Sequence, residues 1–218
     1  MTPFPIAEVL RRIRRTPWRR QAPVLTRMAS KRRDPFRILI ACLLSLRTKD
    51  AVTHLAAARL FRLAATPRAM LARPRQAVER AIYPVGFYRT KATRIHEICR
   101  MLLTRFHGRV PDDLEQLLTL PGVGRKTANL VLIEGFRKDG ICVDTHVHRI
   151  SNRLGFVRTK APEHTEMTLR ATLPRRHWRE YNELLVSFGQ TVCHPTSPWC
   201  SRCPVEPLCA KRGVTQSR

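Results

Sequence analysis

The residues Leu-Pro-Gly-Val-Gly-Arg-Lys-Thr-Ala-Asn at 120–129, followed by Val-Asp-Thr-His at 143–146, decide how the rest of the chain is interpreted. Pro121, Gly122 and Gly124 predict a tight turn. Proline presets φ at a turn, and glycine reaches positive φ without the steric penalty of a Cβ atom. We therefore expect both glycines to adopt the conformations that this turn requires.

Helical patterns lie on both sides of the turn. Asp112 or Asp113 can cap a helix over residues 114–118, because aspartate is a preferred N-cap residue. Lys126 begins a second helix, over 126–136, whose apolar residues Ala128, Val131 and Leu132 share one face. The stretch therefore predicts a helix-hairpin-helix.

The backbone of the turn predicts an anion site. The N–H groups of Gly122, Val123, Gly124 and Arg125 point off the N-terminus of the second helix. Such a helix start favours an anion, of which a DNA phosphate is one example.

The charge of the chain points in the same direction. Its 218 residues include 41 Lys and Arg against 16 Asp and Glu, a formal net charge of +25. This excess predicts a polyanionic partner, for which DNA, RNA and an anionic membrane all qualify. No apolar run approaches the roughly 20 residues that span a bilayer, so a membrane-spanning role is disfavoured.

The remaining patterns predict an all-α fold, since no segment shows sustained strand alternation. Asp34 followed by Pro35 begins a mostly apolar helix, and Thr48 is expected to cap the next one. The helical spacing of Ile6, Val9, Leu10 and Ile13 favours a packed helix at the basic N-terminus over a transit peptide. Further helices are expected at 91–106, stopped by Gly108, and at 147–154, 162–173 and 177–192.

Four of the seven cysteines follow one another near the C-terminus with the spacing C-x6-C-x2-C-x5-C: Cys193, Cys200, Cys203 and Cys209. Four thiolates suit either a tetrahedral zinc ion or a 4Fe-4S cluster. A zinc ribbon usually has two C-x2-C pairs and this run has one, which separates the two alternatives only in part. Cys42, Cys99 and Cys142 lie in apolar sequence and are expected to be ordinary buried thiols.

The hairpin sequence with Lys126, together with Val-Asp-Thr-His, resembles the helix-hairpin-helix DNA glycosylases, and most closely the endonuclease III family. The resemblance covers the chain from Asp34 to Cys209. It implies that Lys126 is the catalytic nucleophile and that Asp144 assists it. The cysteine spacing matches the iron-sulfur loop of that family at every position, so we expect a 4Fe-4S cluster, with zinc as the weaker alternative.

The resemblance also implies two domains. Residues 28–138 would form a six-helix domain with the helix-hairpin-helix, and residues 1–27 with 139–218 a helical iron-sulfur cluster domain. The active site would lie in the cleft between them. The protein is expected to be a monomer in the cytoplasm, associated with the nucleoid, with no membrane partner.

Further DNA contacts follow from the resemblance. In that family, two side chains fill the gap that a flipped nucleotide leaves in the duplex. One follows the first core helix and the other, a bulky one, precedes the helix at 91; here these positions hold Arg47 and Phe87. Arg47 departs from the usual glutamine, which leaves the opposite-base preference open, and its alternative role is to bind phosphate. Thr145 and His146 are expected at the DNA with the hairpin residues.

The implied function is a bifunctional DNA glycosylase and abasic-site lyase of base excision repair, acting on oxidised pyrimidines in duplex DNA. Lys126 must be neutral to attack the sugar, which partial burial favours. Three alternatives remain: a non-enzymatic helix-hairpin-helix DNA-binding module, an iron-sulfur redox protein, and a glycosylase of the same fold for a mismatched or alkylated base. In the simplest alternative roles Lys126 is a solvated helix lysine and Asp144 only a helix cap.

Overall fold

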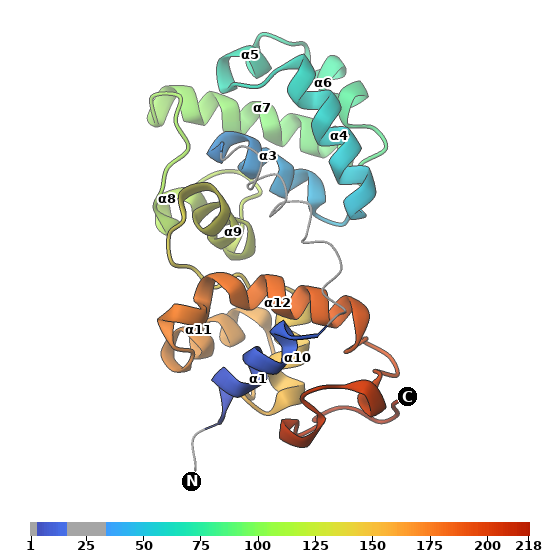
Figure 1. Ribbon diagram of the computed structural model, residues 1–218. Coiled ribbons are helices and arrows are strands. Elements are labelled where there is room, and N and C mark those ends of the chain that lie inside the picture. Colours follow the sequence, from blue (N-terminus) through green and yellow to red (C-terminus); the bar gives the residue numbers. More distant parts are fainter. Residues whose placement is uncertain (1–3, 17–33) are drawn as a thin grey trace. The chain divides into compact units, whose positions relative to one another are not determined.

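The computed structural model of the chain describes residues 4–16 and 34–218. Over these two ranges it contains helices and no β-strand, which confirms the predicted all-α class (Figure 1). The described residues divide into two compact units, one of residues 4–16 with 139–218 and one of residues 34–138. The domain boundary predicted between residues 27 and 28 lies outside the described residues. No helix in the described ranges is long and apolar enough to cross a membrane.

The unit of residues 34–138 is built around one buried helix. Its helices are α3 (Pro35–Ser45), α4 (Asp50–Leu63), α5 (Pro67–Leu71), α6 (Arg75–Ile82), α7 (Tyr88–Arg105), α8 (Leu114–Leu118) and α9 (Arg125–Phe136). Helix α3 contacts α9, α4 and α7, while α6 and α5 pack against α7. A single hydrophobic core joins these helices.

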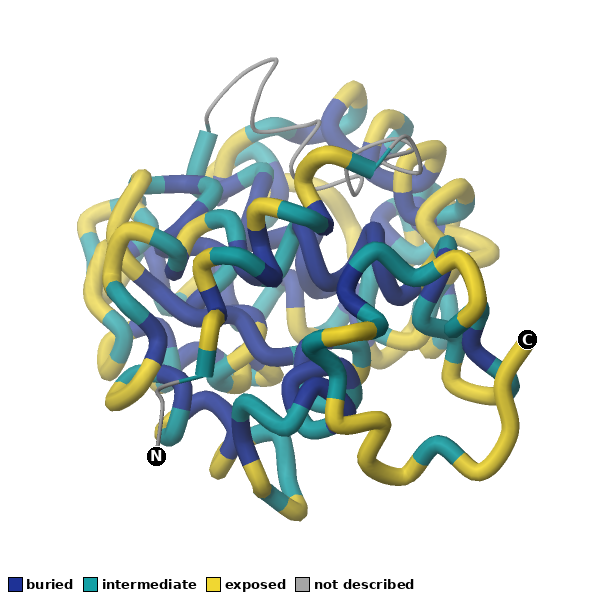
Figure 2. The backbone as a smooth tube through the Cα atoms, turned by 60° about the horizontal axis from the view of Figure 1, so that its bottom comes forward, coloured by how far each residue is buried: buried dark blue, intermediate teal, exposed yellow. Residues whose placement is uncertain are grey.

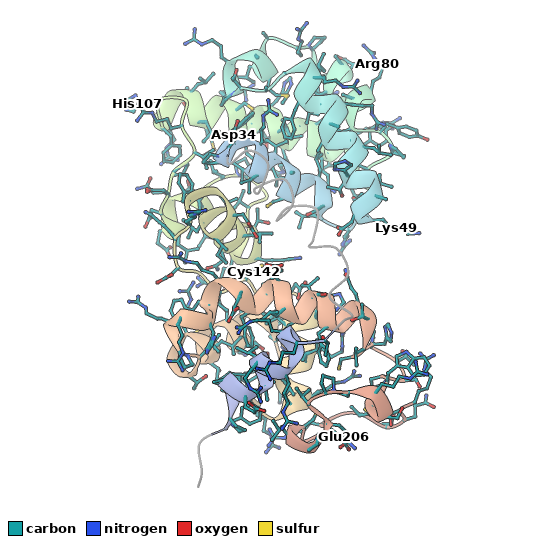
Figure 3. All side chains as sticks on the ribbon, viewed as in Figure 1. Asp34, Lys49, Arg80, His107, Cys142 and Glu206 are labelled. Atoms are coloured by element: carbon teal, nitrogen blue, oxygen red, sulfur yellow. The ribbon has the colours of Figure 1, made fainter. Side chains whose placement is uncertain are left out.

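The start of α3 follows the predicted pattern. Asp34 is the N-cap, and its Oδ1 accepts hydrogen bonds from the N–H groups of Phe36 (3.0 Å) and Arg37 (3.2 Å), with Pro35 in the first turn. Eight of the eleven residues of α3 are buried. A helix that is apolar on all sides is stable only inside a core, which explains why the other helices surround α3. The labelled Asp34 marks this helix start in Figure 3.

The start of α4 contradicts the sequence prediction. Its N-cap is Lys49, labelled in Figure 3, and no side chain caps it. The Thr48 hydroxyl instead donates to the Leu46 carbonyl (3.2 Å) and accepts from the Gly86 N–H (3.2 Å). The prediction of Thr48 as a cap was wrong because a partner far along the chain takes the hydroxyl.

The other unit has its own core. It contains α1 (Ile6–Arg14), α10 (Thr145–Leu154), α11 (Pro162–Thr172), α12 (Trp178–Thr191) and three short 3-10 helices, η1 (Arg175–His177), η2 (Cys200–Arg202) and η3 (Glu206–Leu208). Helix α1 packs on α12 through the apolar face that its spacing predicts, and Arg14 pairs with Glu180 at 2.6 Å. Residues 210–218 form a mostly exposed tail, yellow beside the C label in Figure 2.

Candidate active site and DNA interface

The predicted helix-hairpin-helix is formed by α8, a turn and α9. Asp113 caps α8 by accepting a hydrogen bond from the Gln116 N–H at 3.0 Å. The turn closes where the Val123 N–H donates to the Leu120 carbonyl (3.1 Å). Gly122 lies in the left-handed region, with φ of 79°. The predicted use of glycine at this position is confirmed.

Gly124 departs from the prediction. Its φ of −94° and ψ of 176° are extended backbone, which any residue adopts, and it is the N-cap of α9. Its carbonyl accepts the first helical hydrogen bond, from the Ala128 N–H at 2.9 Å. A Cβ atom at Gly124 would meet nothing within 4 Å. The glycine therefore leaves the surface before the first turn of α9 bare, so that a ligand can reach the backbone.

Lys126 occupies the first turn of α9, one residue after Arg125. Its neighbours Thr127 and Ala128 are buried and anchor this turn in the core, whereas Lys126 is exposed. The predicted partial burial of Lys126 is therefore not found. The helix start holds the lysine at the surface beside the bare backbone of the hairpin.

Asp144 is the N-cap of α10 and is half-buried. Its Oδ1 accepts hydrogen bonds from the N–H groups of His146 and Val147, both at 2.9 Å. The expected capping role is confirmed. Both bonds end on the same oxygen, and Oδ2 makes no hydrogen bond with any described residue. The cap therefore orients the carboxylate and leaves one oxygen for another partner.

Thr145, His146 and His148, at the start of α10, have different surroundings. Thr145 is exposed, and the His146 ring is half-buried against Gly189, where a Cβ atom would come within 2.4 Å of His146 Nδ1. His148 Nδ1 lies 2.7 Å from the Thr165 hydroxyl. Among the described residues, no three or more His, Cys, Asp or Glu side chains converge on a single metal ion. His146 and His148 are half-buried polar residues of α10.

Arg47 and Phe87 come together although 40 positions separate them in the sequence. The guanidinium carbon of Arg47 lies 5.7 Å from the centre of the Phe87 ring, within the range of a cation–π contact. Both residues have positive φ, 52° and 57°. Phe87 is 62% exposed, so its ring is accessible to a partner.

The four C-terminal cysteines line one largely apolar cavity, which Arg153, Trp199 and Val205 also border. Arg153 Nη1 lies 3.4 Å from Cys193 Sγ, and the Lys211 N–H lies 3.4 Å from Cys209 Sγ. Such N–H donors stabilise thiolate ligands. Glu206, labelled in Figure 3, belongs to η3, between Cys203 and Cys209. The donor set therefore fits a group held by four thiolates.

The other three cysteines are buried, as expected. Burial raises the pKa of the Cys99 thiol to about 12. A thiol that stays protonated in this way is a poor nucleophile and a poor metal ligand.

The sequence patterns did not predict the role of three polar residues that make long-range hydrogen bonds. Arg149 Nη2 donates to the Cys193 carbonyl (2.8 Å) and lies 3.2 Å from His146 Nδ1, and Arg153 bonds the His194 carbonyl at 2.6 Å. The third, Lys91, is buried in α7 at heptad spacing from apolar residues that face the core: Ile95, Ile98 and Leu102. That spacing was the signal that could have identified Lys91.

Comparison with known proteins identifies the family. The profile described as HhH-GPD superfamily base excision DNA repair protein matches residues 40–175. The endonuclease III of Thermotoga maritima is 49% identical over 179 residues, which cover 82% of this chain and 84% of that relative. The chain belongs to the endonuclease III family of HhH-GPD base excision DNA repair proteins.

Solved structures agree with membership of the endonuclease III family. A trapped endonuclease III–DNA covalent intermediate is 38% identical, has a TM-score of 0.78, and the match covers 86% of this chain and 92% of that one. A thermostable thymine-DNA glycosylase, 24% identical with a TM-score of 0.79 and 94% of each chain covered, shares the fold. The protein is a bifunctional DNA glycosylase and abasic-site lyase of base excision repair, and DNA is its substrate.

The two hairpin glycines give a matched test. Gly122→Ala should lower the free energy of unfolding by about 1–2 kcal/mol, because alanine is strained at positive φ. Gly124→Ala should lower it by less, roughly 0.5 kcal/mol, because alanine is a poorer N-cap than glycine. It should weaken DNA binding, since its methyl group covers the bare backbone. Urea unfolding and a DNA titration measure the two effects. Equal stability losses in both variants would contradict these backbone conformations.

Proposed function

We propose that Lys126 is the nucleophile of this glycosylase and that Asp144 assists it. The observation that carries the proposal is the position of Lys126, exposed in the first turn of the helix that follows the hairpin. Lys126 follows the N–H groups at that helix start, where a DNA phosphate is favoured. DNA bound there brings a sugar to the lysine.

The proposed reaction has two stages, removal of the base and cleavage of the strand. The neutral Lys126 amine attacks C1′ of the sugar, and the bond from C1′ to the base breaks, so that the base leaves with the electron pair and takes up a proton. The bond from C1′ to the ring oxygen O4′ then breaks, O4′ takes up a proton, and a Schiff base forms between C1′ and the Lys126 nitrogen. Loss of the C2′ proton then breaks the bond from C3′ to the phosphate oxygen, which cuts the strand, and water releases the enzyme.

Asp144 contributes a negative charge and a proton acceptor. Because its Oδ1 is held by two N–H groups of α10, the carboxylate has one orientation. Its Oδ2 can stabilise the positive charge that develops on the sugar and accept a proton from the attacking amine. Its role as a cap and its role in catalysis therefore use different oxygens.

We propose that the hairpin residues 122–125 bind DNA phosphate through the backbone, together with Thr145 and His146 at the start of α10. The net charge of +25 supports this assignment, since phosphate contacts by basic proteins supply much of DNA affinity. Arg47 and Phe87 would fill the gap in the duplex left by the flipped nucleotide, with the exposed Phe87 ring stacking on the neighbouring bases.

Oxidised pyrimidines are the proposed lesions, by resemblance to the endonuclease III family. Arg47, in place of the usual glutamine, can donate hydrogen bonds to acceptors on the opposite base. Arginine has donors and no acceptor, whereas glutamine has both, so the exchange changes which atoms of the opposite base residue 47 can bind.

Cys193, Cys200, Cys203 and Cys209 are proposed to hold a 4Fe-4S cluster. Such a cluster takes one thiolate on each iron, so its ligands stand further apart than four thiolates on one zinc ion at about 2.3 Å. Four cysteines around one cavity, with the spacing of the iron-sulfur loop of the family, support this choice. The cluster would brace the surrounding loops, whose Arg202, Lys211 and Arg212 are exposed and basic.

The domain division is proposed as residues 28–138 for the six-helix domain and 1–27 with 139–218 for the iron-sulfur domain. The separate hydrophobic cores of the two units support it. We place the enzyme in the cytoplasm with the nucleoid, where its substrate lies.

The nucleophile is tested by borohydride trapping on a duplex with one oxidised pyrimidine. Wild type should give a covalent protein–DNA band, and Lys126→Gln should bind the duplex without giving the band or nicking the strand. Lys160→Gln removes the same charge from an exposed lysine outside the hairpin and should behave like wild type. Strand nicking by Lys126→Gln would exclude Lys126 as the nucleophile. Parallel duplexes with a mismatched or an alkylated base test the lesion class.

Asp144→Asn separates the cap from the catalytic charge. Asparagine caps helices about as well as aspartate, so thermal unfolding should be nearly unchanged. Base removal should slow by roughly 100-fold or more, because the charge opposite the developing cation is lost. Single-turnover kinetics measure the rate, with Asp144→Ala as the variant that loses both roles. Wild-type rates in Asp144→Asn would reduce Asp144 to a helix cap.

The cluster is tested by colour and metal content. The purified protein should be yellow-brown and hold about four irons per chain, and Cys203→Ala should lose both colour and iron. Cys99→Ala, which removes a buried thiol outside the cavity, should keep them. A colourless protein with about one zinc per chain would overturn the iron-sulfur assignment.

A further inference from the structure

Lys91 is a buried ammonium group without a carboxylate partner in its hydrogen bonds. Its side chain enters the core of the unit 34–138, where only 9% of the residue is exposed. Nζ donates to the carbonyls of Leu44 (2.9 Å) and Leu46 (2.5 Å) and to the Thr48 hydroxyl (3.3 Å). An ammonium has three donors, and all three are used.

These acceptors lie at the end of α3 and in the loop that follows it. Carbonyls at a helix C-terminus have no partner within the helix and carry the negative end of its dipole. Ser45 is the last residue of α3, and Leu46 and Thr48 flank Arg47. Lys91 therefore holds the backbone on both sides of Arg47.

The same network reaches the loop that carries Phe87. The Thr48 hydroxyl accepts a hydrogen bond from the Gly86 N–H at 3.2 Å, next to Phe87. A Cβ atom at Gly86 would come within 2.8 Å of the Arg47 carbonyl oxygen, so the two loops touch through their backbones. Lys91 itself lies one helical turn after Phe87, and its N–H donates to the Phe87 carbonyl at 2.9 Å.

Arg47 and Phe87 both need such support. A non-glycine residue at positive φ costs on the order of 1 kcal/mol and persists only where its surroundings determine the backbone. We propose that Lys91 is the positioning residue for Arg47 and Phe87, the two side chains that would fill the gap in the duplex. It fixes the two loops that carry them relative to each other through Thr48. This inference rests on the proposed role of Arg47 and Phe87.

Lys91 could also be considered as a nucleophile in place of Lys126. Burial lowers the pKa of Lys91 to about 8, a property that suits a nucleophile. Its amine is nevertheless enclosed by the core, and its three donors are engaged, so it cannot reach a sugar. Its role is therefore exerted through the two loops.

The test uses Lys91→Met and Thr48→Val in the full chain. Thr93→Val is the matched control, because the one hydrogen bond of the Thr93 hydroxyl to a described residue goes to the Arg89 carbonyl of its own helix. Base removal from a fully paired lesion duplex should fall by about 10- to 100-fold in both test variants, since misplaced groups no longer fill the duplex. Strand cleavage and borohydride trapping at a preformed abasic site, where no base has to leave the stack, should change by less than about threefold.

A fluorescent 2-aminopurine opposite the lesion reports directly on the two side chains. Wild type should raise its fluorescence by unstacking it, and Lys91→Met and Thr48→Val should raise it less. The decisive comparison adds Lys91→Met to an Arg47→Ala/Phe87→Ala variant. If Lys91 acts through these two side chains, it should cause no further loss of base removal in that background.

The outcomes separate the two levels of the proposal. If Arg47→Ala/Phe87→Ala keeps the wild-type rate, the assigned role of these residues fails, and the role of Lys91 fails with it. If the Arg47→Ala/Phe87→Ala variant is slow but Lys91→Met alone removes the base at the wild-type rate, only the inference on Lys91 is overturned. The same holds if Lys91→Met slows the Arg47→Ala/Phe87→Ala variant as much as it slows wild type. Loss of trapping at the abasic site would also overturn it. Should Lys91→Met fail to fold, Thr48→Val gives the same comparison.

Discussion

The burial of α3 is the constraint on which the unit of residues 34–138 depends. A helix that is apolar on all sides must be surrounded, and α9, α4 and α7 surround it. At Gly135, α9 lies close to the start of α3, since a Cβ atom there would be 3.4 Å from Pro35. The helix that begins with Arg125 and Lys126 is therefore oriented by its contact with α3. The buried C-terminal end of α3 also needs donors for its carbonyls, and Lys91 supplies them.

Acidic residues are scarce in this chain and are largely used within it. Asp34, Asp113 and Asp144 cap helices, and hydrogen bonds from Arg11 and then Arg12 lower the pKa of Glu8 to about 2. The 41 lysines and arginines outnumber the 16 aspartates and glutamates, so most of the basic charge has no carboxylate with which to pair. The same composition that caps the helices therefore leaves a strongly positive exterior, as binding to a polyanion requires.

The sequence was most informative where chemistry is local. Caps such as Asp34 and Asp113 and the turn at Gly122 depend on neighbours within a few residues, and they form as predicted. Thr48 was assigned wrongly because its partners, Gly86 and Lys91, lie 38 and 43 positions away. The Lys126 and Asp144 assignments came from motifs, whereas the contact between Arg47 and Phe87 and the burial of Lys91 exist only once the chain has folded.

The close approach of Gly86 to the Arg47 carbonyl has a consequence for substitutions at position 47. The two loops meet backbone to backbone, and the hydrogen bonds that hold them use carbonyls, an N–H group, one hydroxyl and one amine. The guanidinium of Arg47 is outside that frame. A change of the side chain at position 47 therefore alters what this loop presents to a partner without removing any of the hydrogen bonds that hold the loop.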